Sequence, residues 1–210
     1  MHEPPPPRRV FCIGRNYAAH VRELGETEDD QCVVFMKPCT SLETIGTPIA
    51  LPRARGAVHH ELELVVALGT GGENIPEERA AEHIDAITLG LDLTLRDLQN
   101  QLKAQGRPWE LCKAFEQSAP IGAFMPYDGR VDLQAIEMTC HVNGELRQIG
   151  HTAHMIFPVS WLISFLSRHW QLLPGDLIFT GTPEGVGEVR PGDQIVIASP
   201  AIGQFTWDMV

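Results

Sequence analysis

The sequence predicts an α+β fold that is mostly β, with several short helices. The predicted strands outnumber the predicted helices, and they are short and separated by glycine and proline residues. A regular alternation of strands and helices, which would indicate a doubly wound parallel sheet, is not present. No linker or change in composition divides the chain, so we expect a flexible proline-rich tail at residues 1–8 and a single domain at 9–210.

The first half of the chain mixes strands and helices. Apolar runs predict strands at 9–14, 32–38 and within 47–69, the last interrupted by a glycine-marked turn. A helix is predicted between the first two strands, with Asn16 as its N-cap and Gly25 as its stop. A second helix is predicted at 75–87, with Pro76 in its first turn.

Strict alternation at 87–95 predicts a buried strand, and a helix follows from Thr94 to Gly106. Asn143 and Gly144 indicate a type I′ hairpin within 136–150, because both residues tolerate positive φ angles. Pro158 begins a predicted helix with an apolar stripe, and the remaining residues form short strands broken by turns.

Composition narrows the possible partners and compartment. The net charge of −11 argues against nucleic acid or an anionic membrane, although it leaves room for a small acidic substrate. The five cysteines include no C-x-x-C pair, as expected of free thiols in a reducing compartment. The N-terminal residues lack the apolar segment of a signal peptide, and no run is long enough for a membrane helix. We therefore predict a cytoplasmic protein.

Two predicted strands carry acids among apolar residues. Glu61 and Glu63 in "HHELELVV" share one face of a strand, about 6–7 Å apart at the backbone. Asp92 lies on the corresponding polar face of "GLDLTL", next to Gly90. Burying three carboxylates is costly, and a bound cation would offset that cost. Oxygen-only ligands favour Mg²⁺ or Mn²⁺ over zinc.

Other interpretations of these acids remain open. Each could pair with an arginine or lie exposed on an edge strand, which is commoner than metal binding. His59 and His60 would allow a zinc site, although "HHELE" in a strand is not the helical H-E-x-x-H motif.

Further polar residues suggest chemistry, each with a simpler structural explanation. His20 and Glu23 are three residues apart on one face of a predicted helix. They could be a general base and the carboxylate that orients it, or they could simply be the solvated end of an amphipathic helix. Lys37 and Lys113 lie in apolar surroundings and would need a substrate anion or a salt bridge. The loop "TGTPEGVG" could hold a small anion through Thr182, or it could be only a tight turn.

Seven segments together resemble the fumarylacetoacetate hydrolase family, in its short acylpyruvate hydrolase and oxaloacetate decarboxylase branch. They are "GRNYAAHVRELG", "VFMKP", "HHELELVVALG", "GLDLTLRDLQ", "GRPWELCKAF", "VNGELRQIG" and "DLIFTGTPEGVG", and they occur in family order from about residue 9 to the C-terminus. The resemblance implies a mixed β-sandwich or β-roll like the C-terminal domain of fumarylacetoacetase, assembled as a homodimer.

The resemblance also implies the roles of individual residues. Mg²⁺ or Mn²⁺ would bind Glu61, Glu63 and Asp92, and Lys113 would be a catalytic residue beside the metal. His20 and Glu23 would form a dyad on a segment, including "GETEDD", that orders over the substrate. Substrate oxygens would be held by residues drawn from Arg15, Lys37, Arg96, Gln99 and Thr182.

The function so implied is metal-dependent hydrolysis of a C–C bond in an acylpyruvate, a small 2-oxo acid, through a stabilised enolate. Water attack on the acyl group needs a base, which on this resemblance would be His20 oriented by Glu23. Decarboxylation of oxaloacetate, enol–keto tautomerisation and isomerisation in aromatic degradation would use the same site. A metal-binding module without turnover would need neither the base nor Lys113. A thiol hydrolase is disfavoured because the neighbours Cys140 and His141 would point to opposite strand faces.

Overall fold

Short strands provide most of the secondary structure in the computed structural model, which describes residues 4–25, 31–52 and 54–210. The strands are β1 Val10–Ile13, β2 Val34–Lys37, β3 Leu42–Thr44, β4 Val58–His60, β5 Leu62–Leu68, β6 Ile84–Leu91, β7 Thr94–Leu95, β8 Ala119–Ile121, β9 Met125–Pro126, β10 Glu137–Val142, β11 Glu145–His151, β12 Leu177–Phe179, β13 Gly187–Val189, β14 Gln194–Ser199 and β15 Gly203–Asp208. The α-helices are α1 Ala18–Glu23, α2 Arg96–Ala104, α3 Glu110–Lys113 and α4 Val159–His169, and the 3₁₀ helices are η1 Cys39–Ser41, η2 Glu77–His83 and η3 Thr152–His154. The predicted class, mostly β with short helices, is confirmed.

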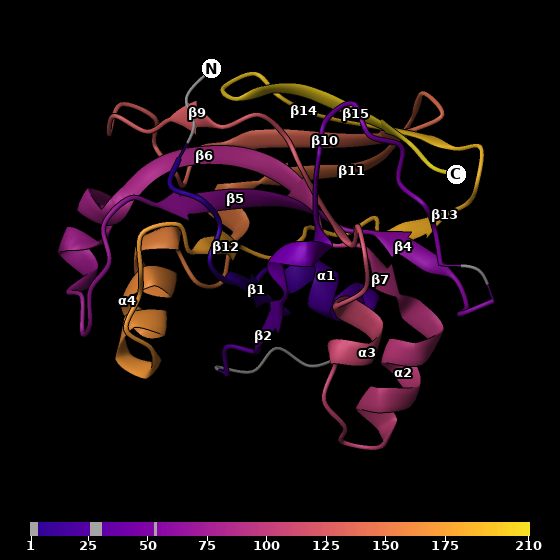
Figure 1. The fold of residues 1–210 in the computed structure, drawn as a ribbon, viewed down its shortest axis with the longest axis horizontal. Helices are drawn as coiled ribbons and strands as arrows, with labels where there is room; N and C mark the ends of the chain where they lie inside the picture. The colour runs from indigo at the N-terminus through magenta and orange to yellow at the C-terminus, as the bar shows by residue number, and fades with distance from the viewer. Residues whose placement is uncertain (1–3, 26–30, 53) are drawn as a thin grey trace.

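The strands form three sheets. The largest has the order β2-β1-β12-β5-β6-β8-β3, with β9 paired to β6, and the second has the order β11-β10-β14-β15. The third sheet has three strands in the order β13-β4-β7. In the chain, β4 directly precedes β5 and β7 directly follows β6. The large sheet is mixed, because β1 pairs with β12 and β3 with β8 in parallel while its other pairs are antiparallel. In Figure 1 the second sheet lies along the upper side of β5 and β6, and the four α-helices lie below them.

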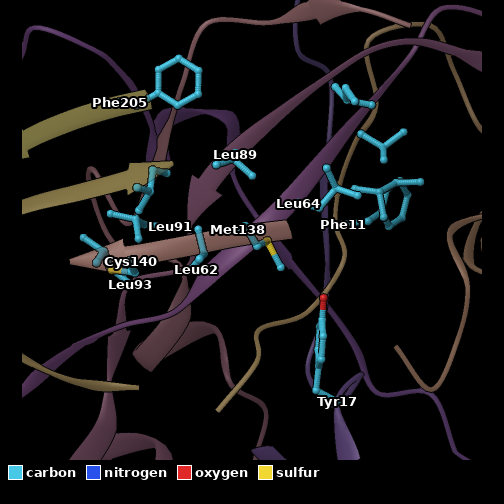
Figure 2. Packing of buried hydrophobic residues seen from close by; sticks show 14 of the residues in the cluster. Phe11, Tyr17, Leu62, Leu64, Leu89, Leu91, Leu93, Met138, Cys140 and Phe205 are labelled. Atoms are coloured by element: carbon cyan, nitrogen blue, oxygen red, sulfur yellow. The ribbon is translucent and has the colours of Figure 1, made fainter. Parts of the chain in front are cut away.

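Successive side chains of β5 and β6 point to opposite faces of the large sheet and pack in two different apolar clusters. Leu62, Leu64, Leu89 and Leu91 pack with Met138 and other residues of the second sheet, as Figure 2 shows. The other face of these strands packs in a separate apolar cluster that includes Val65 of β5 and Phe179 of β12. Gly90 faces this second cluster, where a Cβ atom would lie 2.8 Å from Phe179 Cε1. The glycine therefore permits close packing beside the acids.

The strand predicted to run through Glu61 is divided at that residue. β4 ends at His60 and pairs with β7 and β13, whereas β5 begins at Leu62 and pairs with β6. The Glu61 carbonyl still accepts a hydrogen bond from the Asp92 amide, at 2.9 Å. Both interruptions, at Glu61 and at Asp92, therefore lie side by side.

Two further local predictions were wrong. Asn16 does not cap α1, whose N-cap residue is Tyr17 without a side-chain bond. The Asn16 side chain instead bonds the backbone of Phe157 and Thr180, which ties β1 to distant segments. The helix expected at 75–87 is the 3₁₀ helix η2, and it gives way to β6 at Ile84.

Other predicted elements are confirmed. Asn143 and Gly144 have φ angles of 53° and 79°, as the predicted hairpin between β10 and β11 requires. Pro158 is the N-cap of α4. In the tail, residues 1–3 lie outside the described part, and the Arg8 amide donates to Gly175 O at 3.0 Å. None of the helices in the described ranges is both long and apolar enough to cross a bilayer.

Candidate active site

Three buried carboxylates converge where β4, β5 and β6 meet. Glu61 lies between β4 and β5, Glu63 lies within β5, and Asp92 follows β6. One carboxylate oxygen from each lies within 4.8 Å of the others, and the residues are only 5%, 1% and 1% exposed. Because side chains alternate along a strand, Glu61 and Glu63 share the face opposite Leu62 and Leu64. The predicted acidic group is therefore present as one cluster.

Lys113, at the end of α3, lies directly against this cluster. Its Nζ atom lies 2.8 Å from Glu61 Oε2 and 2.5 Å from Asp92 Oδ2. Burial alone would lower the pKa of Lys113, but the charges of the two carboxylates raise it above its usual range. Lys113 is therefore a buried ammonium ion in the cluster.

Lys37, at the end of β2, lies behind Asp92. Its Nζ atom is 2.9 Å from Asp92 Oδ1 and donates to Ser118 Oγ at 2.9 Å, Leu93 O at 3.2 Å and the carbonyl of Lys113. Three protein acceptors therefore match the three protons of the ammonium, and Asp92 Oδ1 adds an ion pair. These contacts indicate a structural role for Lys37, and its predicted contact with substrate stays a prediction.

Arg96 and Gln99, in the first turns of α2, approach the cluster from the Glu61 side. The Arg96 guanidinium contacts Glu61 Oε1 through one terminal nitrogen and the Gln99 side-chain oxygen through the other. Both residues are buried. Burial would raise the pKa of Glu61, but the charges of Lys113 and Arg96 hold it well below its usual range.

Glu63 differs from the other two acids in its partners. Gly181 donates its backbone amide to Glu63 Oε2 at 2.8 Å, and no ion pair in the described ranges joins Glu63 to a cationic side chain. Burial, followed by the charges of Asp92 and Glu61, raises the pKa of Glu63 well above its usual value. The cluster therefore lacks positive charge at Glu63.

The donor set fits a hard divalent cation. All three groups are carboxylates, the ligands that Mg²⁺ and Mn²⁺ prefer. Asp92 Oδ1 is buried and receives no hydrogen bond from the described residues, because Lys37 approaches it outside hydrogen-bonding geometry. A cation held by Glu61, Glu63 and Asp92 would supply the positive charge that Glu63 lacks. His59 and His60 are not members of the acidic cluster.

The predicted dyad is formed on α1. His20 is 2% exposed, and its Nδ1 atom lies 2.9 Å from Glu23 Oε2. The other Glu23 oxygen accepts the Gly185 amide at 2.9 Å, which joins α1 to the loop after β12. Burial alone would raise the pKa of Glu23, but these two hydrogen bonds lower it below its usual value. Residues 26–30 of the "GETEDD" stretch lie outside the described part, so closure of this segment stays a prediction.

The loop "TGTPEGVG" adjoins both the dyad and the acids. Gly181 has a φ of +97°, and a Cβ atom there would lie 2.6 Å from Asn16 Cβ, so glycine is required. Thr182, the next residue, is buried beside the Gly181 amide that binds Glu63. Arg15 follows β1. Burial of Lys103 on α2 lowers the pKa of that lysine, and the charge of Arg15 lowers it further. Contact of either residue with substrate stays a prediction.

The cysteines give no support to a thiol nucleophile. All five are free, and Cys140 Sγ lies 3.8 Å from His60 Nδ1 instead of meeting His141. Burial raises the pKa of Cys140 to about 12, so its thiol stays protonated at neutral pH. A thiolate is the reactive form, which disfavours thiol hydrolysis.

Gln148 of β11 was not identified from the sequence as part of the site. It is 1% exposed and bonds both the β4–β5 junction and Thr182. A signal was available, because "VNGELRQIG" places a large polar side chain on a strand of the family motif. The alternation of that strand was not informative, since Leu146 and Ile149 are exposed.

Comparison with known proteins agrees with this arrangement. The family model described as fumarylacetoacetate (FAA) hydrolase C-terminal matches residues 9–210. "Oxaloacetate tautomerase FAHD1, mitochondrial" of Rattus norvegicus is 44% identical over 188 residues, which cover 90% of this chain and 85% of that protein. "Oxaloacetate tautomerase YcgM" of Escherichia coli is 41% identical over 195 residues, which cover 91% of this chain and 88% of that protein.

A solved structure is similar over almost the whole chain. It is the fumarylpyruvate hydrolase of Pseudomonas aeruginosa in complex with Mn²⁺ and pyruvate, with a TM-score of 0.93 and 42% identity. The match covers 98% of this chain and 90% of that one. These relatives are enzymes, and the resemblance inferred from the sequence motifs is confirmed. The chain therefore belongs to the fumarylacetoacetate hydrolase family.

Proposed function

We propose that this protein is an Mg²⁺- or Mn²⁺-dependent hydrolase that cleaves the C–C bond of acylpyruvates through an enolate. The observation that carries the proposal is the position of Lys113, which lies within hydrogen-bonding distance of two of three clustered, buried carboxylates. Buried acids with a lysine among them suit chemistry that develops negative charge on oxygen. The Mn²⁺ and pyruvate bound by the Pseudomonas aeruginosa relative support the metal and the substrate class.

Glu61, Glu63 and Asp92 would hold the cation. When bound, Mg²⁺ or Mn²⁺ supplies a Lewis acid for the two neighbouring oxygens of a 2-oxo acid. The protein's own contribution is to keep the three carboxylates buried and close together. The backbone amide of Gly181 and the guanidinium of Arg96 fix two of them, and Lys113 spans Glu61 and Asp92.

His20 would act as the base that activates water. Its Nδ1 atom faces the Glu23 carboxylate at 2.9 Å, so the proton belongs on Nδ1 and the Nε2 lone pair is available. Glu23 is fixed in turn by the Gly185 amide. The dyad can therefore accept a proton at Nε2 while the carboxylate stabilises the resulting imidazolium.

Lys113 would place positive charge beside the forming enolate. It is buried, it keeps its proton, and its contacts fix its ammonium group at the acids. In a water-poor site such a charge stabilises an oxyanion more strongly than it would in solvent. Arg15, Arg96, Gln99 and Thr182 remain our candidates for holding substrate oxygens, and Lys37 supports Asp92.

Oxaloacetate enol–keto tautomerisation is the second candidate. Two relatives at 44% and 41% identity carry this activity in their names. Conversion of the enol to the keto form adds a proton at C3 and removes the proton of the enol hydroxyl. This transfer needs the dyad, but it needs no attack by water. Decarboxylation of oxaloacetate would also generate the enolate. It would need no base to activate a water molecule, because no water attacks the substrate.

A substrate panel tests these alternatives. Acetylpyruvate, fumarylpyruvate and enol-oxaloacetate would each be offered with Mg²⁺, with Mn²⁺ and with EDTA. We expect cleavage of at least one acylpyruvate that is lost in EDTA and restored by metal. Rapid ketonisation of enol-oxaloacetate with no acylpyruvate cleavage would establish the second candidate in place of the first.

Two further expectations stay proposals. A homodimer is proposed from the family resemblance, and light scattering of the purified protein tests it. A cytoplasmic location is proposed from the sequence, whereas the name of the Rattus norvegicus relative includes the word mitochondrial. Fractionation of cells that express the protein from its own gene would decide between compartments.

A further inference from the structure

We infer that Gln148 is a positioning residue that holds the hydroxyl group of Thr182 as a hydrogen-bond donor to an anionic substrate oxygen. The inference rests on the proposed function, because it concerns how that site recognises a 2-oxo acid. Gln148 belongs to β11 of the second sheet, and its side chain is buried where the three sheets meet.

Two backbone groups fix the orientation of the Gln148 amide. The Leu62 amide donates to Oε1 at 3.0 Å, and Nε2 donates to the carbonyl of Pro183 at 2.9 Å. A backbone N–H can only donate and a carbonyl can only accept, so the oxygen and nitrogen of the side chain cannot be exchanged.

This orientation fixes the roles of the two remaining partners. His60 Nδ1 lies 2.9 Å from Oε1, so it must carry a proton and donate. Thr182 Oγ1 lies 2.9 Å from Nε2, so it must accept. Gln148 thereby uses both its donors and both its acceptor positions.

The proton of the Thr182 hydroxyl is consequently directed away from Gln148. Among the described contacts its acceptor is Pro183 O at 3.4 Å, longer than the 2.5–3.0 Å usual for an O–H···O bond. Pro183 O also already receives Gln148 Nε2 at 2.9 Å. A buried hydroxyl with its lone pair engaged and its proton poorly satisfied is an effective donor to a new acceptor.

The location of this donor indicates what it binds. Thr182 follows Gly181, whose amide holds the Glu63 carboxylate at 2.8 Å. Thr182 therefore adjoins along the chain the residue that holds Glu63, and we take its hydroxyl as the donor for a ligand oxygen bound at the acids. An anionic oxygen, as in a carboxylate or an enolate, gains most from such a donor.

The alternative role for Gln148 is to support the metal ligands through Leu62, the neighbour of Glu61. Measurements on the metal-loaded protein separate the two roles. Oxalate is a suitable probe, because its adjacent carboxylate oxygens resemble those of the pyruvate enolate. The affinity for oxalate would be measured by calorimetry on the Mn²⁺-loaded protein, and the affinity for Mn²⁺ would be measured separately.

We expect Thr182→Val and Gln148→Met each to weaken oxalate binding by about tenfold or more, the loss expected for one hydrogen bond to a charged group. The double variant should bind oxalate within about twofold of Thr182→Val, because both changes remove the same interaction. Thr182→Ser should retain most of the affinity. Mn²⁺ affinity should change little in all of them, and the KM for substrate should rise more than kcat falls.

Two more variants guard against loss of the fold. Gln148→Glu keeps the acceptor for Leu62 but replaces the donor to Thr182 by an oxygen, so it should weaken oxalate as Gln148→Met does. Gln134→Met is the matched control, since Gln134 also bonds two backbone groups, Thr152 O at 2.9 Å and the Val159 amide at 3.1 Å, away from the acids. It should leave oxalate affinity unchanged.

Three results would overturn the inference. They are additive losses in the double variant, an equal loss of Mn²⁺ affinity in Gln148→Met, and wild-type oxalate affinity in the Gln148 variants. If the wild-type protein loaded with Mn²⁺ bound neither oxalate nor a 2-oxo acid, the proposed function would fail as well. The behaviour of the wild type therefore separates the two failures.

Discussion

The Nζ atom of Lys113 lies 2.5 Å from Oδ2 of Asp92, and both side chains are almost completely buried. The same ammonium is 2.8 Å from Glu61 Oε2. Replacing it with the nearly isosteric methionine should lower kcat by roughly 10²–10³, as expected when charge stabilisation of an oxyanion is lost. KM should change only a few-fold for both acylpyruvate and oxaloacetate. Equal effects on KM and kcat would instead indicate that Lys113 anchors a substrate carboxylate.

Lys37→Met should act mainly on stability. Lys37 pairs with Asp92 and donates to three further oxygens, so its removal leaves a buried carboxylate and several acceptors short of partners. Breaking such a pair costs about 3–5 kcal/mol. The free energy of unfolding in urea, measured on metal-free protein, tests this.

The control for Lys37 is Arg79→Ala on the exposed Arg79–Glu82 pair, which should leave the free energy of unfolding almost unchanged because solvent screens the pair. A loss of similar size in both variants would contradict the structural role assigned to Lys37.

His20→Ala should separate hydrolysis from decarboxylation. Water attack needs a base, so acylpyruvate cleavage should fall by roughly 10²–10⁴-fold, whereas oxaloacetate decarboxylation should fall much less. The measurement is the ratio of the two kcat/KM values under identical Mg²⁺, with His154→Ala at an exposed position as the control. An unchanged ratio would mean that His20 is not the water-activating base.

Glu23 should contribute a pH-dependent part of the stability. Burial opposes its ionisation, but the hydrogen bonds from His20 and the Gly185 amide lower its pKa in the folded protein. A carboxyl group with a lowered folded pKa stabilises the fold above its unfolded value of about 4.3, and this stabilisation is lost as pH falls through the folded pKa. The wild type should therefore exceed Glu23→Gln in stability at neutral pH, by a margin that shrinks in acid.

The check for Glu23 is urea unfolding of both proteins at about pH 7 and at about pH 3, on either side of that carboxyl value. Glu78→Gln, which removes the same charge at an exposed position, is the control. A margin that stays constant or grows in acid would contradict the role given to these hydrogen bonds.

The local pattern was sufficient to predict the acidic cluster. Strand side chains alternate, so the position of Leu62 and Leu64 in the core directs Glu61 and Glu63 to the other face. The same argument placed Asp92, although the strands are broken at Glu61 and Asp92. The breaks depend on pairing with β7 and β13, which a local sequence pattern does not encode.

Other features depend on contacts between residues far apart in the sequence. Asn16 has the chemistry of an N-cap, but the carbonyls of Phe157 and Thr180 compete successfully for its amide. Lys37 was predicted to need an anionic partner, and which partner it has depends on where α3 and Asp92 meet β2. The orientation of Gln148 is set by Leu62 and Pro183, which lie far from it along the chain.

We expect Glu61, Glu63 and Asp92 to hold a divalent cation that is needed to form a 2-oxo acid enolate. Enolate formation can be followed directly as exchange of the C3 protons of pyruvate for deuterium by NMR. In wild-type protein, exchange should occur with Mg²⁺ or Mn²⁺, stop with EDTA and resume when metal is restored. Glu63→Gln should lose both the exchange and the stabilisation that added metal gives the wild type, yet remain folded without metal. Exchange at the wild-type rate in EDTA, or in Glu63→Gln, would contradict the claim.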